Sequence, residues 1–231
     1  MEVLLLNTWR NFSEIKKYTR ANKYDYEWIA ENWMGPNPLY LAEELCNNMD
    51  LKPGMKVLDM GCGKGCSSVF LAKEYGVTVF ATDLWIPATE NLKRFEKAGV
   101  ADSVYPIHAE AHSLPFAEGF FDAAVSFNSY HYYGTCDLYF PQIYSKLVKQ
   151  GGQFGVVLDG QINEDDKGGE GHHSKEWWKR HWEKTDLVEF TACYEFDDPK
   201  SADEGLYITS IDELGFNPVN FSLIVMSAIK K

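Results

Sequence analysis

The chain alternates between short apolar runs and longer stretches whose apolar residues recur at helical spacing. The apolar runs predict strands at residues 55–60, 77–82, 104–109, 121–127 and 153–158, and two closing strands at 187–196 and 219–229. Helical spacing predicts helices at 67–75, 87–98, 137–148 and 174–184, and an earlier one from Pro36-Asn37-Pro38 to about Asn48. Alternating strands and helices require right-handed crossovers, so we expect a parallel sheet covered on both faces.

Three segments depart from this alternation. Residues 1–35 hold many aromatic side chains among charged ones without strand-like alternation, which predicts one or two short helices forming a cap. Residues 161–171 are polar and rich in glycine, which predicts a mobile loop. The segment that joins the two closing strands is irregular and acidic.

The composition is that of an ordinary folded protein of 231 residues, 45% hydrophobic and 24% charged. Lys and Arg number 22 against 34 Asp and Glu, so the net charge is −12. A nucleic-acid partner needs a basic face, so this balance makes nucleic acid an unlikely partner, whereas a small cation would meet a favourable field.

Nothing in the sequence indicates a membrane or an export route. Its longest apolar runs fall far short of the roughly 20 residues that cross a bilayer, and Val3-Leu4-Leu5-Leu6 is too short for a signal-peptide core. The five cysteines are odd in number and scattered, which favours reduced thiols. We therefore expect a cytoplasmic protein with no membrane insertion.

A glycine-rich turn, Val57-Leu58-Asp59-Met60-Gly61-Cys62-Gly63-Lys64-Gly65, joins a predicted strand to the helix at 67–75. Glycine permits positive φ and close approach to a ligand, and the free amides of the helix N-terminus face that ligand. Dinucleotide folds place their third glycine where this chain has Cys66. Asp59 would repel a phosphate and attract an ammonium group, which favours S-adenosylmethionine over NAD. Asp83, which ends the next strand, suits the ribose of either ligand.

Four stretches, in this order, resemble class I S-adenosylmethionine-dependent methyltransferases, in the small-molecule group that includes UbiE-like enzymes. They are Val57–Gly65, Ala81-Thr82-Asp83, Ala109–Phe116 and Phe121–Asn128, and Leu147–Gly152 resembles the family's turn into its fifth strand. The likeness spans about residues 55–158.

The resemblance implies an α/β fold, a Rossmann-like three-layer sandwich with a mostly parallel seven-stranded sheet, an antiparallel last strand and helices on both faces. Residues 36–231 would be the S-adenosylmethionine-binding methyltransferase domain, with substrate-facing insertions at about 160–215, and residues 1–35 a small helical cap or lid.

The resemblance also implies a set of cofactor-binding residues. They are Asp59, Gly61, Cys62, Gly63, Gly65, Asp83, Leu84, Glu110, Ala111 and Asn128. Asp59 would hold the methionine amino group, directly or through water, and the glycines would let the backbone pass beside methionine and ribose. Asp83 would bind the ribose, Leu84 would pack on the adenine, and Glu110 and Ala111 would lie at the adenine edge, although the family more often has Asp at 110. Asn128 would lie under the sulfonium.

The catalytic candidates follow the fourth strand. His131 is the first candidate for a general base or a substrate-positioning group, with Tyr130 and Tyr132 behind it, and a packed histidine is the alternative. Methyl transfer is an in-line displacement, so the protein's main contribution is alignment and exclusion of water. A base is needed only for a protonated hydroxyl or amine. The aromatic flanking segments favour a small organic acceptor with an apolar or planar part.

We predict no metal site from the sequence. Cys62 and Cys66 form a single Cys-x-x-x-Cys pair with no second pair nearby. His108 and His112 fit the lining of an adenine pocket better than metal ligation, and His172-His173 fits a solvated helix cap.

Two other functions fit the same residues. One is an NAD(P)-dependent oxidoreductase on a similar sheet, against which Asp59 and Cys66 argue. The other is a non-catalytic S-adenosylmethionine-binding protein, because every motif named above binds cofactor rather than performs chemistry. In each case we expect a small-molecule partner and a monomer or homodimer.

Overall fold

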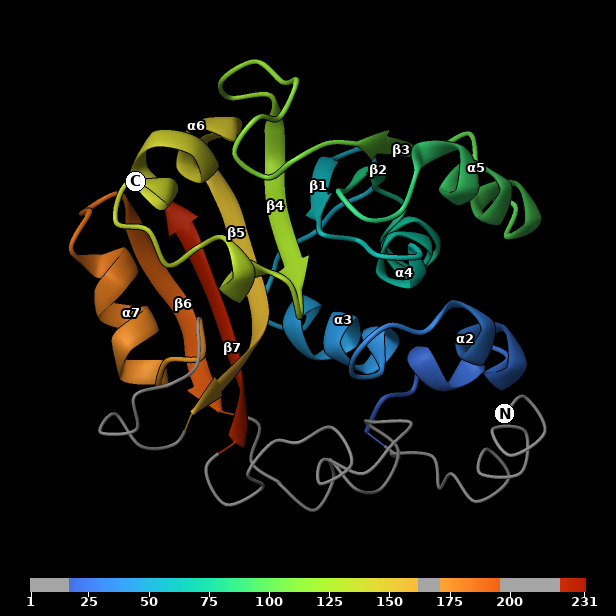
Figure 1. Cartoon of the computed structure of the whole chain (residues 1–231), viewed down its shortest axis with the longest axis horizontal. Coiled ribbons are helices and arrows are strands. Elements are labelled where there is room, and N and C mark those ends of the chain that lie inside the picture. The colour runs from blue at the N-terminus through green and yellow to red at the C-terminus, as the bar shows by residue number, and fades with distance from the viewer. Residues whose placement is uncertain (1–16, 162–170, 196–220) are drawn as a thin grey trace.

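The computed structural model describes residues 17–161, 171–195 and 221–231, and its core is a seven-stranded sheet in the order β3-β2-β1-β4-β5-β7-β6 (Figure 1). The strands are β1 Lys56–Met60, β2 Thr78–Asp83, β3 Val104–His108, β4 Phe121–Phe127, β5 Val148–Gln161, β6 Val188–Glu195 and β7 Phe221–Lys230. β7 is antiparallel to β5 and β6, and the other paired strands are parallel. The predicted mostly parallel sheet with an antiparallel last strand is confirmed.

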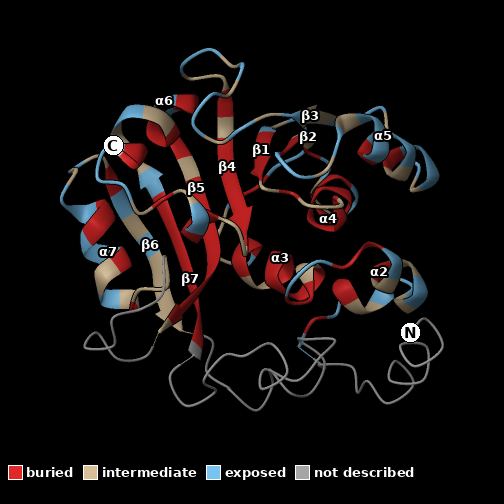
Figure 2. Cartoon of the chain, viewed as in Figure 1, coloured by how far each residue is buried: buried red, intermediate tan, exposed pale blue. Residues whose placement is uncertain are grey.

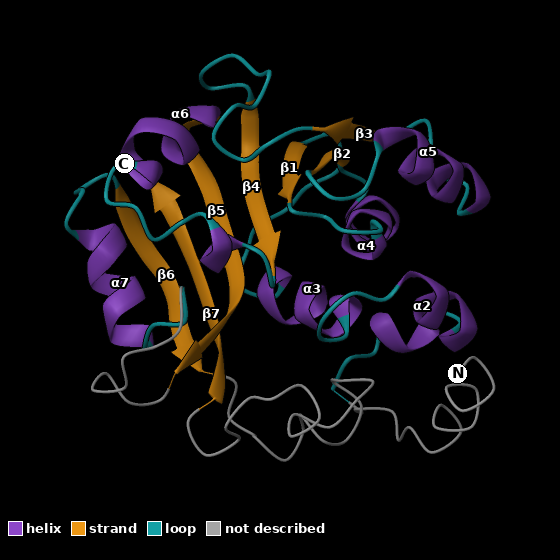
Figure 3. Ribbon diagram, in the orientation of Figure 1, coloured by secondary structure: helices purple, strands orange, loops and turns teal. Residues whose placement is uncertain are grey.

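Helices cover both faces of this sheet, as the ribbon in Figure 3 helps to follow. The helical elements are η2 Ala21–Lys23, α2 Tyr26–Asn32, α3 Pro38–Cys46, α4 Cys66–Tyr75, α5 Ala88–Lys97, η3 Tyr130–Tyr132, η4 Phe140–Tyr144, α6 Ser145–Leu147 and α7 Lys175–Glu183. Successive residues of a strand point to opposite faces. Val57 of β1 therefore packs in the cluster that holds α3 and α4, whereas Leu58 packs in the cluster that holds Trp178 and Trp182 of α7. The three-layer sandwich is confirmed, with β4, β5 and β7 buried over most of their length (Figure 2).

The helix predicted at 137–148 is wrong in form and length. This segment makes one wide π-helical turn, η4, and the three-residue helix α6, after which β5 begins at Val148. Pro141 has no N–H for a regular helical hydrogen bond, and the wide turn buries Phe140 against Trp182, with ring centroids 4.5 Å apart. The start of β5 also carries an irregularity, because Phe121 pairs with Val148 but Ala123 pairs with Gln153.

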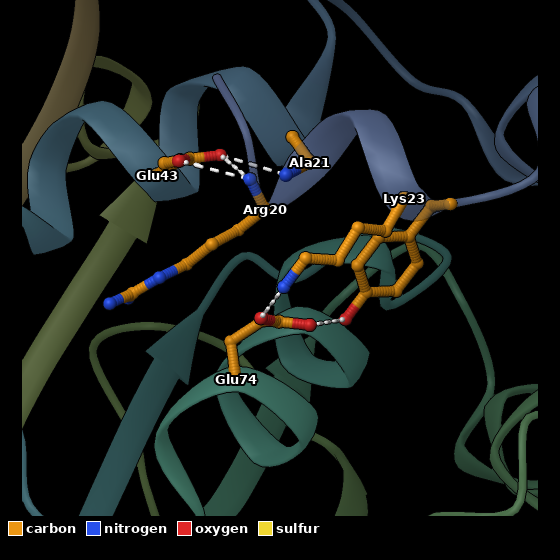
Figure 4. A network of polar contacts seen from close by, with 6 residues as sticks. Arg20, Ala21, Lys23, Glu43 and Glu74 are labelled. Carbon is orange, nitrogen blue, oxygen red and sulfur yellow. Dashed lines mark hydrogen bonds and ion pairs between the residues drawn. The ribbon is translucent and has the colours of Figure 1, made fainter. Parts of the chain in front are cut away.

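Two carboxylates fasten the segment before α2 to the helices behind it (Figure 4). Buried Glu43 of α3 accepts hydrogen bonds from the backbone N–H of Arg20, at 3.1 and 3.2 Å, and of Ala21, at 2.7 Å. Glu74 of α4 accepts from the Lys23 ammonium at 3.4 Å and the Tyr24 hydroxyl at 3.2 Å. Helical structure is thus present in the described part of the predicted cap, and residues 1–16 lie outside the described residues.

The predicted loop at 161–171 falls mostly outside the described residues, as does the segment between the closing strands. In the part of the chain that the structure describes, no helix is both long and apolar enough to cross a membrane.

Candidate active site

A cavity of about 310 Å³ lies at the carboxyl ends of β1, β2 and β4. β1 sits between β2 and β4 in the sheet, so the strand order reverses there, and open α/β sheets bind ligands at such a point. The wall comes from residues within 32–38, 60–67, 82–85, 109–112 and 127–133. The volume is at the lower end of the range for small-molecule sites.

The glycine-rich turn forms the floor of this cavity. The backbone N–H groups of Gly61 and Cys62 donate to the Thr82 carbonyl at 2.9 and 3.0 Å, which ties the turn to the end of β2. Gly61 has φ +72°, and a Cβ at this position would collide with the Ser129 hydroxyl. Gly61, Cys62 and Gly63 line the cavity, whereas Gly65 lies behind it at the start of α4.

Asp83 organises the turn and also faces the cavity. One carboxylate oxygen accepts from the Gly63 N–H at 2.8 Å, and the other accepts from the N–H groups of Trp85 at 2.7 Å and Ile86 at 2.9 Å. The side chain is buried but lines the cavity. Asp83 therefore lies at the end of a strand beside the glycines, which is the position that the sequence predicts for it.

Asp59 is fully buried one layer behind the cavity wall. Its Oδ2 accepts from the hydroxyls of Ser67 at 2.7 Å and Ser68 at 2.6 Å, and Ser67 itself lines the cavity. Its Oδ1 is buried and has no hydrogen-bond partner among the residues that the structure describes. Burial, opposed by the two serine hydroxyls and aided by the charge of Asp83, raises the pKa of Asp59 to about 6. At neutral pH the carboxyl group of Asp59 is therefore mostly ionised.

The far side of the cavity is lined by Leu84 and Glu110, together with Ala111. Glu110 accepts from the His112 ring at 2.6 Å and from its backbone N–H at 2.9 Å, and the ring hydrogen bond lowers the pKa of Glu110. The Ala111 carbonyl accepts from the Tyr139 hydroxyl at 3.2 Å. These contacts leave the carboxylate of Glu110 and the backbone of Ala111 in a fixed arrangement at the cavity wall.

Asn128 ends β4 in the left-handed region, with φ 50°, a conformation that Asn tolerates better than most residues. Its N–H donates to the Val157 carbonyl at 2.7 Å. With its amide nitrogen turned toward Asp159, Asn128 donates to both oxygens of that carboxylate, at 2.7 and 3.1 Å. Asn128 lines the cavity and so connects it to β5.

The three catalytic candidates lie in different surroundings. Tyr132 is 61% exposed and lines the cavity, where its ring lies 5.9 Å from that of Trp85. Tyr130 is fully buried among aromatic rings, including Trp178 and Trp182, and burial raises the pKa of its hydroxyl far above the ordinary value. His131 is 1% exposed and not part of the cavity wall. Burial and the neighbouring His172 lower its pKa to about 3, which makes it a weak base.

A protein-family model described as a methyltransferase domain matches residues 57–152. This match identifies residues 57–152 as a methyltransferase domain. The sterol 24-C-methyltransferase ERG6B of Gibberella zeae is 29% identical over 113 residues, 48% of this chain and 30% of that protein. Phosphoethanolamine N-methyltransferase 1 of Zea mays is 31% identical over 110 residues, which are 43% of this chain and 22% of that protein. The chain thus spans less than a third of the length of these two relatives.

Solved structures share the fold of this methyltransferase domain. The geranyl diphosphate C-methyltransferase of Streptomyces coelicolor A3(2), in complex with Mg²⁺, geranyl diphosphate and S-adenosylhomocysteine, superimposes with a TM-score of 0.69 at 16% identity, over 82% of this chain and 77% of that chain. The [4+2]-cyclase SpnF superimposes with a TM-score of 0.68 at 16% identity, over 83% of this chain and 80% of that chain. At these identities the likeness concerns the fold alone.

Sequence reasoning missed several wall residues of the methyltransferase domain. Met34, before α3, lies beside the glycine turn, with its sulfur 3.0 Å from where a Cβ on Gly63 would sit. Tyr133 joins the ends of β1 and β4, because its hydroxyl contacts the Ser126 hydroxyl at 2.9 Å and donates to the Met60 carbonyl at 3.2 Å. The aromatic run 130–133 was the available signal, but spacing does not say which of its rings face the cavity.

Proposed function

We propose that this chain binds S-adenosylmethionine in the cavity and transfers its methyl group to a small organic acceptor. The observation that carries the proposal is the pair of carboxylates at the glycine-rich turn, Asp83 facing the cavity and Asp59 behind it with an unpartnered oxygen. This pair suits a ligand that brings ribose hydroxyls and a positive charge together.

The same charges disfavour a dinucleotide. A pyrophosphate needs free backbone N–H groups and no nearby carboxylate, but the Gly63 N–H donates to Asp83, and the N–H groups of Gly61 and Cys62 donate to the Thr82 carbonyl. Lys64 lines the cavity, and its ammonium donates to the Glu31 carbonyl at 3.1 Å. An NAD(P)-dependent oxidoreductase is therefore the weaker interpretation of this site.

We assign roles to the residues by position. Asp83 would accept hydrogen bonds from the ribose hydroxyls, and Leu84 would cover one face of the adenine. Glu110 and Ala111 would meet the adenine edge. Ser67, held by Asp59, would meet the methionine end, with Asp59 supplying charge and orientation rather than direct contact. Gly61, Cys62 and Gly63 would present backbone, Gly65 would seat the start of α4, and Asn128 would bound the site of transfer.

Bound S-adenosylmethionine would supply an electrophilic methyl group on a sulfonium, which an acceptor displaces in line. The protein's part is then to align the acceptor and to exclude water. Tyr132, which lines the cavity and is accessible, is the catalytic candidate best placed to contact an acceptor. The names of the relatives include sterol and phosphoethanolamine, which supports a small-molecule acceptor here. A non-catalytic S-adenosylmethionine binder is the second candidate, because every motif recognised in the sequence binds cofactor rather than performs chemistry.

We also propose a cytoplasmic protein, a monomer or homodimer, that does not act on nucleic acid. The net charge of −12 supports the last point, because phosphate backbones require a basic surface.

Replacing Asp83 by alanine is expected to weaken S-adenosylmethionine binding tenfold or more, about 1.4 kcal/mol. The substitution removes the ribose acceptor and the acceptor of three backbone N–H groups. Isothermal titration with S-adenosylmethionine and S-adenosylhomocysteine measures the change, and Asp102→Ala, an exposed aspartate before β3, is the matched control.

Circular dichroism of each variant separates lost binding from lost folding. Failure of the folded wild type to bind either compound would overturn the proposal, and saturable binding of NADH instead would restore the oxidoreductase. If S-adenosylmethionine binds but no acceptor in a broad screen yields S-adenosylhomocysteine, the non-catalytic candidate takes first place.

A further inference from the structure

Three potential metal ligands converge beside the cavity, from segments far apart in the sequence. His131 lies in η3 after β4, Asp159 lies in β5, and His172 precedes α7. One ligand atom from each lies within 4.8 Å of the other two. Zinc binds imidazole and carboxylate at about 2.0–2.2 Å, which places two ligand atoms of one ion roughly 3–3.5 Å apart. Binding of one ion would therefore require His172, the least buried of the three, to move closer to the other two residues.

His131 points to a ligand independently of this spacing. Its ring is 1% exposed, and among the described residues neither ring nitrogen has a hydrogen-bond partner. A buried polar group without a partner is costly, and each such group calls for an explanation. A bound cation would give one of these nitrogens its missing partner.

The backbone conformation at Gly171 brings His172 next to His131. Gly171 has φ +94°, and a Cβ there would collide with the His131 carbonyl. Only glycine allows the chain to pass so closely at that φ. The ring centroids of His131 and His172 consequently lie 5.2 Å apart.

Asp159 has a supporting group of the kind that metal ligands have. The Asn128 amide, turned with its nitrogen toward Asp159, donates to the carboxylate at 2.7 and 3.1 Å. Such outer hydrogen bonds orient a ligating carboxylate and are usual around metal sites. Asn128 also lines the cavity, so the cluster and the cavity share a wall.

We propose that His131, Asp159 and His172 bind one divalent transition-metal ion of the type of Zn²⁺ or Fe²⁺. Two imidazoles and one carboxylate are the ligand set that such ions favour, and three protein ligands leave coordination positions open. This site goes beyond the sequence prediction, which treated His172 as part of a helix cap. An acceptor with an anionic oxygen or a thiolate would suit the open positions, a use that rests on the proposed methyl transfer.

Metal binding itself is tested without any turnover. Untagged protein is dialysed against a chelator, freed of it, and titrated with Zn²⁺ in a calorimeter, with Co²⁺ absorption as a second readout of the ligands. We expect one equivalent per chain, and at least tenfold weaker binding by His172→Ala and by Asp159→Asn. His172 is the preferred position for substitution because it is only partly buried.

His173→Ala is the matched control, since His173 is the adjacent histidine and stacks on Trp177, with centroids 3.7 Å apart, outside the cluster. Wild-type protein that binds no Zn²⁺ or Co²⁺ would overturn the site. So would His172→Ala that binds as tightly as His173→Ala, because the ion would then lie elsewhere. Titration of the same samples with S-adenosylmethionine keeps the two proposals separate, since either ligand can bind without the other.

Discussion

Gly65→Ala is expected to lower the free energy of unfolding by about 3 kcal/mol. Gly65 caps the N-terminus of α4 at φ +83°, where an L side chain is strained. Its missing Cβ also leaves room for the ring of Phe95 from α5, which is completely buried and would collide with an added methyl group. Thermal unfolding should show a midpoint lower by about 6–12 °C for a domain of this size.

Gly99→Ala isolates the backbone part of this effect. Gly99 follows α5 at φ +70°, but no atom of the described residues lies within 4 Å of the place that a Cβ would take there. We expect it to lose only about 1 kcal/mol, the cost of the left-handed conformation. The double variant Gly65→Ala with Phe95→Leu should lose less than the sum of its single variants, because the smaller side chain relieves the collision. Equal losses at positions 65 and 99 would show that α4 and α5 are not packed this closely at the turn.

The strand-end motifs could be predicted because parallel strands bring their carboxyl ends to one edge of a sheet. Asp83 ends β2 and Gly61 directly follows β1, so the parallel pairing of these two strands brings the carboxylate and the glycine-rich turn together. Asn128, which directly follows β4, was assigned to the cofactor site through the resemblance to methyltransferases.

Side-chain direction in short irregular elements could not be predicted in this way. Tyr130, His131 and Tyr132 occupy one turn of η3, yet one enters the aromatic cluster, one is buried beside Asp159, and one faces the cavity. No hydrophobic period exists over three residues to separate these outcomes. His172 reaches His131 through a glycine with positive φ, a conformation that spacing in the sequence does not reveal.

Asp59→Asn is expected to stabilise the ligand-free protein while weakening S-adenosylmethionine binding. In the folded chain, burial raises the pKa of Asp59 from 3.8 to about 6, so its ionisation opposes folding. A carboxyl whose pKa is raised by folding contributes full stability below the unfolded value, and that stability is lost as pH rises through the folded value. The wild type therefore loses about 3 kcal/mol between pH 3.8 and pH 7 from this group.

The asparagine oxygen can still accept from Ser67 and Ser68, as Oδ2 of the aspartate does. Its amide nitrogen would take the place of the unpartnered Oδ1 and lack an acceptor, which costs about 1 kcal/mol. The variant should thus be more stable than the wild type by about 2 kcal/mol at pH 8, with the difference reaching zero at about pH 4–5 and reversing in sign below that. Thermal unfolding of both proteins from pH 4 to pH 8 measures this change.

Asp122→Asn is a control of opposite sign. Burial raises the pKa of Asp122, but hydrogen bonds from the Lys149 ammonium and the Lys56 N–H outweigh it and lower the pKa overall. Removal of this carboxylate charge should therefore destabilise the protein at neutral pH.

Calorimetry at pH 8 should show at least tenfold weaker S-adenosylmethionine binding by Asp59→Asn, because the carboxylate charge that favours the cationic ligand is gone. A variant that is less stable at pH 8 and binds as tightly as the wild type would contradict both the buried charge and its part in binding.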